Sequence, residues 1–251
     1  MKKEEFVGDW LFRYTGCALD EFGKYILLCN FSSYVRLFSD TYGVPIRGED
    51  RPMSCATHND ITIINFGIGS PSAATIIDLL TAISPSCVVF LGKCGSVKPK
   101  VKTGDYILPI AGIRGEGTSD SYLPPEVPAL PAFALQRTIS SAIKEKERDY
   151  WTGTVFTTNR RVWEHDDSFR EYLKKIRAMA VDMETATIFS VCFHNEIVAG
   201  SLLLVSDQPL YSEGIKTSSS DKTVDRNYLE EHLSIGILAI QKLIGDSRTL
   251  K

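Results

Sequence analysis

The sequence lacks the features of a nucleic-acid-binding protein or a membrane protein. Its 251 residues include 28 Lys and Arg against 31 Asp and Glu, a formal net charge of -3, whereas nucleic-acid binders usually carry a basic face. No apolar run approaches the ~20 residues that a membrane-spanning helix requires. The first ten residues, MKKEEFVGDW, contain two lysines but no apolar core, so we expect no signal peptide. These absences predict a cytoplasmic protein that binds neither nucleic acid nor membrane.

The sequence also lacks the spacings typical of metal sites and disulfide frameworks. Its six cysteines form no Cys-x-x-Cys pair, and most lie in or beside apolar runs, as buried free thiols do. Its four histidines show no metal-ligand spacing. We therefore predict a reduced protein that needs no metal and no cofactor.

What is present is an alternation of strand and helix patterns. Hydrophobic residues make up 43% of the chain, and without repeats or an interdomain linker we predict one α/β domain over residues 1–251. Apolar and β-branched runs predict strands over 25–29, 61–66, 87–91, 105–108, 154–157, 179–183 and 201–205. Helical patterns cover 32–42, 73–83, 132–147, 169–176, 184–194 and 228–244. Residues 1–24 show no periodicity, and residues 211–225 are predicted to be a connector or a lid.

The stretch 178–209, AMAVDMETATIFSVCFHNEIVAGSLLLVSDQP, has the most informative pattern. A strand–helix–strand crossover of this kind is expected to make its two strands a parallel pair in a sheet covered on both faces. Glu184 follows the first strand and Asp207 the second, at the carboxyl edge where open α/β sheets bind ligands. Singly, Glu184 also fits a helix-terminus acid and Asp207 a turn residue. The pair therefore carries the prediction of a two-carboxylate site.

Small residues follow two other predicted strands, at Gly67–Ser72 and Gly92–Ser96. Such loops let backbone amides approach a ligand, although each also fits a tight turn, and Lys93 within the second also fits a lysine extending to solvent. Asn159–Trp163 adds a basic and aromatic cluster that suits a planar or anionic ligand or a solvated surface. The residues alone therefore predict an enzyme or small-molecule binder with two carboxylates.

Four motifs in order resemble the purine nucleoside phosphorylase and nucleosidase family: Gly67–Ser72, Cys94-Gly95 followed by Gly104-Asp105, Met183-Glu184, and Ser206-Asp207. Segments 104–108, 123–128, 157–164 and 231–237 are similar to the members that act on AMP. The resemblance implies a three-layer α/β/α fold with a central mixed sheet. It also implies hydrolysis of the N-glycosidic bond of AMP to adenine and ribose 5-phosphate. The long N-terminal region of some of these members has no counterpart here, so regulation by ATP or phosphate is not expected.

The resemblance implies roles for single residues as well. Asp207 would be the general acid at purine N7, its pKa raised by burial. Glu184 would bind the ribose hydroxyls, and its charge would stabilise the positive charge that develops on the sugar. The further substrate-binding candidates are Met183 beneath the ribose, Phe156, Cys94, Gly95 and Trp163 around the base, and Gly69 and Lys93 in the two small-residue loops.

Two positions bear on the nucleophile. Phosphorylases of this family place arginines where this chain has Phe90 and Ser33. Without those cations a phosphate dianion would bind poorly, so water is the expected nucleophile, unless Arg36, Arg47 or Arg51 of a neighbouring subunit restores a positive charge.

The 5′-phosphate of AMP needs an anion site of its own. The candidates are Arg114, Arg160, Arg161, Lys93 and Lys216, and bidentate recognition favours Arg161 and Arg114. The resemblance implies a homo-oligomer, either a dimer or a hexamer. Two alternatives stay open: a phosphorylase or nucleosidase that acts on unphosphorylated nucleosides, and a non-catalytic nucleotide-binding module.

Overall fold

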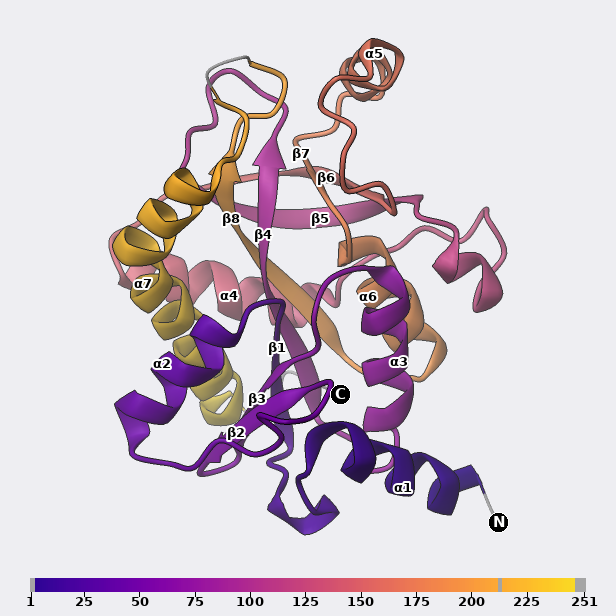
Figure 1. The fold of residues 1–251 in the computed structure, drawn as a ribbon, viewed down its shortest axis with the longest axis vertical. Coiled ribbons are helices and arrows are strands. Elements are labelled where there is room, and N and C mark those ends of the chain that lie inside the picture. The colour runs from indigo at the N-terminus through magenta and orange to yellow at the C-terminus, as the bar shows by residue number, and fades with distance from the viewer. Residues whose placement is uncertain (1–2, 212–213, 247–251) are drawn as a thin grey trace.

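The computed structural model describes residues 3–211 and 214–246 and has three layers, with a sheet between two groups of helices (Figure 1). The strands are β1 Tyr25–Cys29, β2 Ser54–His58, β3 Ile61–Asn65, β4 Cys87–Ser96, β5 Tyr106–Gly115, β6 Tyr150–Thr158, β7 Ala180–Asp182 and β8 Ala199–Asp207. The helices are α1 Lys3–Thr15, α2 Ser32–Tyr42, α3 Ser70–Leu80, α4 Phe133–Glu145, α5 Asp167–Lys175, α6 Thr185–His194 and α7 Ser218–Gly245. The three-layer arrangement that the resemblance implied is confirmed.

Two large apolar cores hold the layers together. Helices α1, α3 and α6 pack on one face of the sheet, and α2, α4 and α7 on the other. The central strands are apolar on both sides, as expected for strands covered by helices on both faces; in β4 all ten residues are buried. A third, smaller cluster, which includes Phe156, Trp163 and Leu173, packs around α5.

The sheet is mixed and curls back on itself. Its strand order is β2-β3-β1-β4-β7-β6-β5-β8, and β8 also pairs with β4. Strands β4, β7, β6, β5 and β8 therefore form a closed ring, and β1, β3 and β2 extend the sheet from β4. Strand β4 belongs to both parts, because it pairs with β1 along its first half and with β7 at its last two residues.

The predicted parallel pairing of 179–183 with 201–205 is wrong. Strand β7 pairs antiparallel with β4 and parallel with β6, whereas β8 runs parallel to β4. The two strands nevertheless meet the same end of β4, one on each side. The physical reason for the error is that a three-residue strand such as β7 does not constrain where the following crossover returns.

Other predicted boundaries also change. Helix α1 forms within residues 1–24, where the glycines suggested no helix, and β2 was not predicted. Helix α7 begins at Ser218, capped by the Thr217 hydroxyl, so the predicted connector or lid loses its second half; residues 212 and 213 of that segment lie outside the described residues. Within the described ranges, no helix is long and apolar enough to cross a membrane.

A buried histidine ties α7 to the sheet. His232 Nδ1 lies 2.7 Å from the Tyr34 hydroxyl, and Nε2 lies 3.0 Å from the carbonyl oxygen of Leu202. A neutral ring that donates from Nε2 and accepts at Nδ1 satisfies both contacts. Burial lowers the pKa of His232 to about 3.

This histidine predicts acid sensitivity of the fold. Between pH 6.5 and about 3 the unfolded chain binds a proton at this position and the folded chain does not, so the free energy of unfolding falls as the pH drops through that window. We expect His232→Gln to make the free energy of unfolding less dependent on pH in this window, by up to about 1.4 kcal/mol per pH unit. This expectation holds whatever the effect of the substitution on stability at pH 7. Urea unfolding at several pH values between 7 and 4 measures this slope, and parallel curves for variant and wild type would contradict the assignment.

Candidate active site

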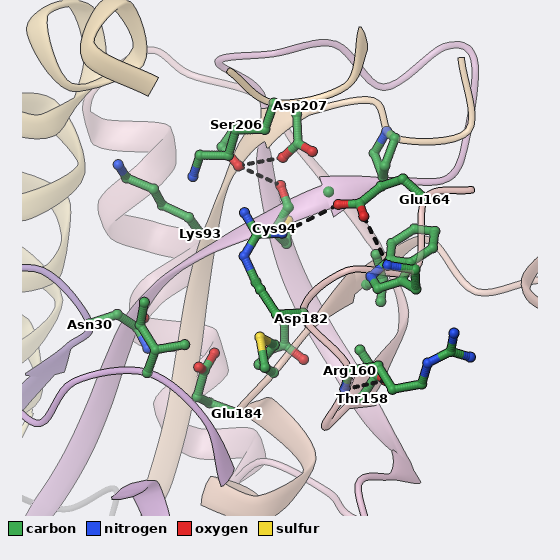
Figure 2. Close-up of a pocket in the computed structure, with 18 of the residues that line it drawn as sticks. Asn30, Lys93, Cys94, Thr158, Arg160, Glu164, Asp182, Glu184, Ser206 and Asp207 are labelled. Carbon is green, nitrogen blue, oxygen red and sulfur yellow. Dashed lines mark hydrogen bonds and ion pairs between the residues drawn. The ribbon is translucent and has the colours of Figure 1, made fainter. Parts of the chain in front are cut away.

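A pocket opens at the end of β4, between β7, β8, the segment before α5 and the first turn of α7 (Figure 2). It brings together residues from almost the whole length of the chain. The lining residues are Asn30, Phe31, Ile68, Lys93, Cys94, Gly95, Thr158, Arg160, Arg161, Trp163, Glu164, Val181, Asp182, Met183, Glu184, Ser206, Asp207, Pro209, Lys216 and Asp221.

The end of β4 sets the positions of both predicted carboxylates. Gly95 is opposite Asp207 in β8 and opposite Val181 in β7. The register with β8 shifts between Cys94 and Gly95, a β-bulge that redirects side chains locally. A Cβ atom at position 95 would lie 2.8 Å from Pro209 and 3.5 Å from an oxygen of Asp207, so only glycine fits there without a shift.

Glu184 is buried at the start of α6. It occupies the N-cap position, but its side chain caps nothing; instead Oε1 accepts a 2.7 Å hydrogen bond from the backbone N–H of Gly69. Burial, followed by the negative charge of Asp182, raises the pKa of Glu184 to about 8. Gly69 has φ +100°, a conformation that glycine adopts readily.

Asp182 and Thr157 replace Glu184 as the cap of α6. Asp182 Oδ2 accepts from the N–H of Thr185 at 2.8 Å, and Oδ1 accepts from the Thr157 hydroxyl at 2.7 Å. The Thr157 oxygen in turn accepts from the N–H of Ala186 at 2.9 Å. Because these two side chains satisfy the free N–H groups of the first helical turn, the Glu184 carboxylate is available to the pocket.

Asp207 lies at the end of β8. Its Oδ1 accepts a 2.6 Å hydrogen bond from the Ser206 hydroxyl. Burial raises the pKa of Asp207 despite this hydrogen bond and the positive charges of Lys216 and Arg161, and the negative charge of Glu164 raises it further. Within the described ranges, neither Asp207 nor Glu184 forms a salt bridge to a cation within 4 Å, so no close ion pair counteracts the effect of burial on either pKa.

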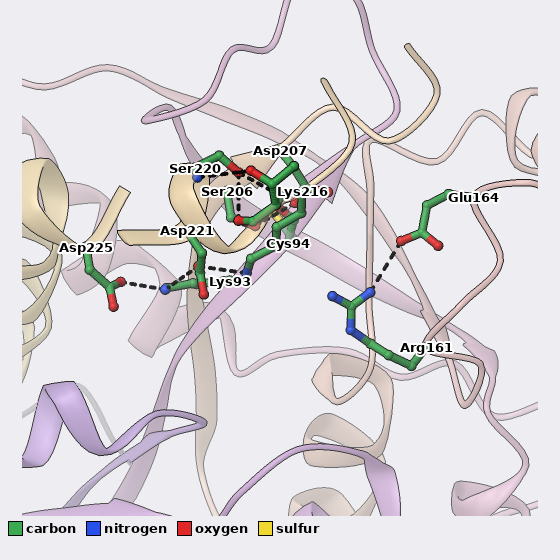
Figure 3. A network of polar contacts seen from close by, with 11 residues as sticks. Lys93, Cys94, Arg161, Glu164, Ser206, Asp207, Lys216, Ser220, Asp221 and Asp225 are labelled. Atoms are coloured by element: carbon green, nitrogen blue, oxygen red, sulfur yellow. Dashed lines mark hydrogen bonds and ion pairs between the residues drawn. The ribbon is translucent and has the colours of Figure 1, made fainter. Parts of the chain in front are cut away.

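The cations of the pocket are paired with other carboxylates (Figure 3). Lys93, with its side chain 3% exposed, lies 3.0 Å from Asp221 and 2.5 Å from Asp225, and its Nζ is 4.4 Å from the centre of the Phe31 ring. Lys216 lies 2.9 Å from Asp221. The remaining two pairs are Arg160 with Asp166 at 2.8 Å and Arg161 with Glu164 at 3.3 Å.

The comparisons with known proteins agree with this arrangement. The sequence model described as "Phosphorylase superfamily" matches residues 24–240. The chain belongs to the phosphorylase superfamily. The resemblance drawn from the four motifs is therefore confirmed at that level.

Three similar proteins match this chain to different degrees of identity and coverage. AMP nucleosidase of Escherichia coli K12 is 31% identical over 94% of this chain, which spans 58% of that protein's length. The structure of AMP nucleosidase from Bacteroides thetaiotaomicron VPI-5482 superposes with a TM-score of 0.89 at 51% identity, covering 98% of this chain and all of the other. Uridine phosphorylase from Vibrio fischeri ES114, at 22% identity, covers 89% of this chain and 93% of its own with a TM-score of 0.78, a similarity of fold alone.

Within this superfamily fold, most of the predicted site residues come together. The pocket is lined by Asp207, Glu184, Met183, Cys94, Gly95, Lys93, Trp163 and Arg161. Gly69 lies just behind it as the donor to Glu184. Phe156 does not line it; its ring fills the space beside Gly115, with edge-on contacts to Phe169 and Tyr172.

Two predicted arginines lie elsewhere. Arg114 does not line the pocket, because its guanidinium donates to the carbonyl oxygens of Leu123, Pro124 and Val127 and pairs with Asp120 at 2.8 Å. Arg47 pairs with Glu21 at 2.7 Å outside the pocket of its own chain.

The sequence reasoning missed Asn30, Asp182, Glu164 and Ser206 as site residues in their own right. Asp182 and Ser206 each lie within two positions of a predicted carboxylate, which was the available signal. Asn30 directly follows β1, and only the pairing of β1 with β4 brings it to the pocket. Across residues 3–211 and 214–246, no group of three or more His, Cys, Asp or Glu side chains is arranged to hold a metal ion.

The Asp182 contacts predict a shift in the titration of Glu184. Asp182→Asn removes the negative charge that, after burial, contributes most to the raised pKa of Glu184, so ionised Glu184 becomes easier to form and its pKa falls. The ¹³C chemical shift of the Glu184 side-chain carboxyl, assigned with Glu184→Gln, follows this titration. Asp167→Asn on the exposed face of α5 is the matched control, and a Glu184 pKa unchanged in Asp182→Asn would refute the coupling.

Proposed function

We propose that this protein hydrolyses the N-glycosidic bond of AMP and releases adenine and ribose 5-phosphate. The observation that carries the proposal is the placement of Asp207 and Glu184 in one pocket, Glu184 buried and Asp207 half-buried, both with a raised pKa and neither salt-bridged to a cation among the described residues. The AMP nucleosidases of E. coli and B. thetaiotaomicron, at 31% and 51% identity, support the choice of reaction. The proposal includes a cytoplasmic location and a homo-oligomeric assembly.

Asp207 acts as the acid. An enzyme acid works best when its pKa lies near the operating pH, and burial moves the pKa of Asp207 in that direction. The Asp207 proton moves to N7 of the purine, and the electrons of the C1′–N9 bond leave with the base as neutral adenine. Gly95, which lies beside Asp207, and Trp163 frame the base.

Glu184 acts on the sugar. Its Oε1 is held by the Gly69 N–H, and the remaining lone pairs of the carboxylate accept hydrogen bonds from the ribose hydroxyls. Because substrate hydroxyls that donate to the carboxylate favour its charged form, binding lowers the pKa of Glu184 below that of the empty site. The resulting negative charge stabilises the oxocarbenium-like transition state.

Water is the nucleophile in this proposal. Phe90 is fully buried and packs 5.9 Å, centre to centre, from the Phe66 ring, so it supplies no charge at the position where phosphorylases of the family have an arginine. Lys93 is already neutralised by Asp221 and Asp225. The charge of Lys93 is therefore not free to bind a phosphate dianion. Water adds to C1′, and its proton passes to the solvent or to Glu184.

Arg161 is the preferred ligand of the 5′-phosphate. It lines the pocket, and its side chain is 59% exposed. Its distance of 3.3 Å to Glu164 is longer than the ion-pair distances of the other three lining cations, Lys93, Arg160 and Lys216. Arg160 is held closer to its own partner, Asp166. Arg114, favoured on sequence grounds, is replaced in this role because five hydrogen bonds hold it to the 119–127 segment.

The proposal is tested by measuring adenine release from AMP and from adenosine, each with and without phosphate. We expect release from AMP without phosphate, with ribose 5-phosphate as the second product. Asp207→Asn should retain AMP binding and lose about 10²–10⁴-fold in kcat, the usual contribution of a proton donor.

The control is Asp40→Asn, a charge change on an exposed residue of α2, which should behave as wild type. Strict dependence on phosphate, or a preference for adenosine, would replace the proposal with a phosphorylase or with a nucleosidase for unphosphorylated substrates. Undiminished turnover by Asp207→Asn would exclude Asp207 as the acid.

The phosphate assignment gives a second expectation. Arg161→Ala should reduce kcat/KM for AMP by at least 10-fold more than for adenosine, because only AMP carries the charge that Arg161 binds. Arg137→Ala, an exposed arginine on α4, is the matched control in steady-state assays. Equal losses with both substrates would assign the anion site to another cation.

A further inference from the structure

Glu164 is a further pocket carboxylate, besides Asp207 and Glu184, for which the proposed reaction has no use. It is 9% exposed and comes from the segment between β6 and α5. Its Oε2 accepts a 2.9 Å hydrogen bond from the N–H of Trp163, which fixes the carboxylate from behind. Figure 2 shows Glu164 and Asp207 with their carboxylates turned into the same cavity, with Glu184 separate from them.

Glu164 and Asp207 influence each other electrically. Both side chains line the same pocket (Figure 2), and the negative charge of Glu164 is one of the causes that raise the pKa of Asp207. On Asp207, Oδ1 is occupied by the Ser206 hydroxyl, whereas Oδ2 lies on the side of Gly95. The pocket therefore presents the carboxyl group of Asp207, the proposed proton donor, together with the side chain of Glu164, whose oxygens accept hydrogen bonds.

This pair matches one edge of one kind of purine. Adenine presents an acceptor at N7 and an N–H donor at the neighbouring 6-amino group, whereas guanine presents two acceptors, N7 and O6; hypoxanthine shares that O6. We propose that Glu164 accepts a hydrogen bond from the 6-amino group and is the residue that restricts this enzyme to 6-aminopurine nucleotides. The proposal rests on the proposed function, because it takes Asp207 as the partner of N7.

Glu164 has the hydrogen-bonding capacity for this role. Oε1 accepts a hydrogen bond from Arg161 at 3.3 Å, and a carboxylate oxygen accepts more than one hydrogen bond. When the 5′-phosphate engages Arg161, the amino group of the base takes the place of the guanidinium at Oε1. Substrate binding thus replaces the ion pair between Arg161 and Glu164 by two contacts with the substrate. Arg161 then binds the 5′-phosphate, and Glu164 accepts from the 6-amino group.

The same geometry rejects 6-oxopurines. With N7 at Asp207, the O6 atom of IMP or GMP would face the Glu164 carboxylate, and two acceptors would meet in a buried site without a proton between them. A pairing of this type discriminates between bases by about 10- to 100-fold. The Glu164→Gln substitution keeps the shape: its amide oxygen can still accept from the Trp163 N–H, and its amide NH2 group can then donate to O6.

The test compares kcat/KM for AMP, IMP and purine ribonucleotide, which has hydrogen at position 6, in the wild type and in Glu164→Gln. We expect the kcat/KM of the wild type for AMP to exceed that for each of the other two by at least 10-fold. In Glu164→Gln the ratio of kcat/KM for AMP to kcat/KM for IMP should fall by at least 10-fold. Glu171→Gln, an exposed glutamate of α5, is the matched control and should leave the ratio unchanged.

Each outcome decides one of the two proposals. AMP hydrolysis with an unchanged AMP/IMP ratio in folded Glu164→Gln, or equal cleavage of AMP and purine ribonucleotide by the wild type, would overturn the role of Glu164 and leave the proposed function standing. The purine ribonucleotide comparison needs no variant and decides the question if Glu164→Gln fails to fold. Cleavage of none of the nucleotides would overturn the proposed function itself.

Discussion

The pairing of β4 on both sides at its last residues is the constraint on which the site depends. Gly95 is opposite Asp207 in one strand and Val181 in the other, so a single backbone position sets the separation of the two strands that deliver the reacting carboxylates. The bulge between Cys94 and Gly95 shifts the register of β4 with β8 immediately before the two residues of β4 that pair with β7. Pro209 packs against the bare Gly95 backbone, and any side chain there would push β8 and Asp207 away.

A second constraint is electrostatic. Each lining cation of the described chain has a carboxylate partner other than Asp207 or Glu184: Asp221 and Asp225 for Lys93, Asp221 for Lys216, Asp166 for Arg160 and Glu164 for Arg161. A cation salt-bridged to Asp207 would stabilise its ionised form and lower its pKa, which would remove the acid. The distribution of ion pairs thus leaves burial as the leading influence on both reacting carboxylates.

Local patterns in the sequence predicted much of this fold, because most elements are long apolar runs or amphipathic segments. The patterns failed where the decisive contact is distant in sequence. The direction of β7 depends on its pairing with β4 and β6, more than 20 residues away, and helix α1 is stabilised by packing on α3 rather than by its own periodicity. The elongation of β5 beyond Leu108 follows from its nine-residue register with β6, which no local signal contains.

The candidate site divides in the same way. Asp207 and Glu184 could be found because each follows an apolar strand, and the motifs around them are short and local. Arg114 and Arg161 are indistinguishable in sequence; only the carbonyl oxygens of 123–127 around Arg114 separate a structural arginine from one that faces the pocket. Glu164 lies beside Trp163 in a motif already noted, but its place in the same pocket as Asp207 depends on the segment before α5, where Trp163 packs in one cluster with Val181 of β7.

The burial of the thiols has a practical consequence. All six cysteines are free and buried, and burial raises the pKa of the Cys87 thiol to about 12 and that of Cys94 well above its usual range. Because the thiolate is the reactive form, alkylating reagents reach these positions only when the surrounding structure opens. The labelling rates of the native cysteines in β1, β2, β4 and α6 therefore report local opening, and that of Cys94, which lines the pocket, reports how often the structure opens at the end of β4.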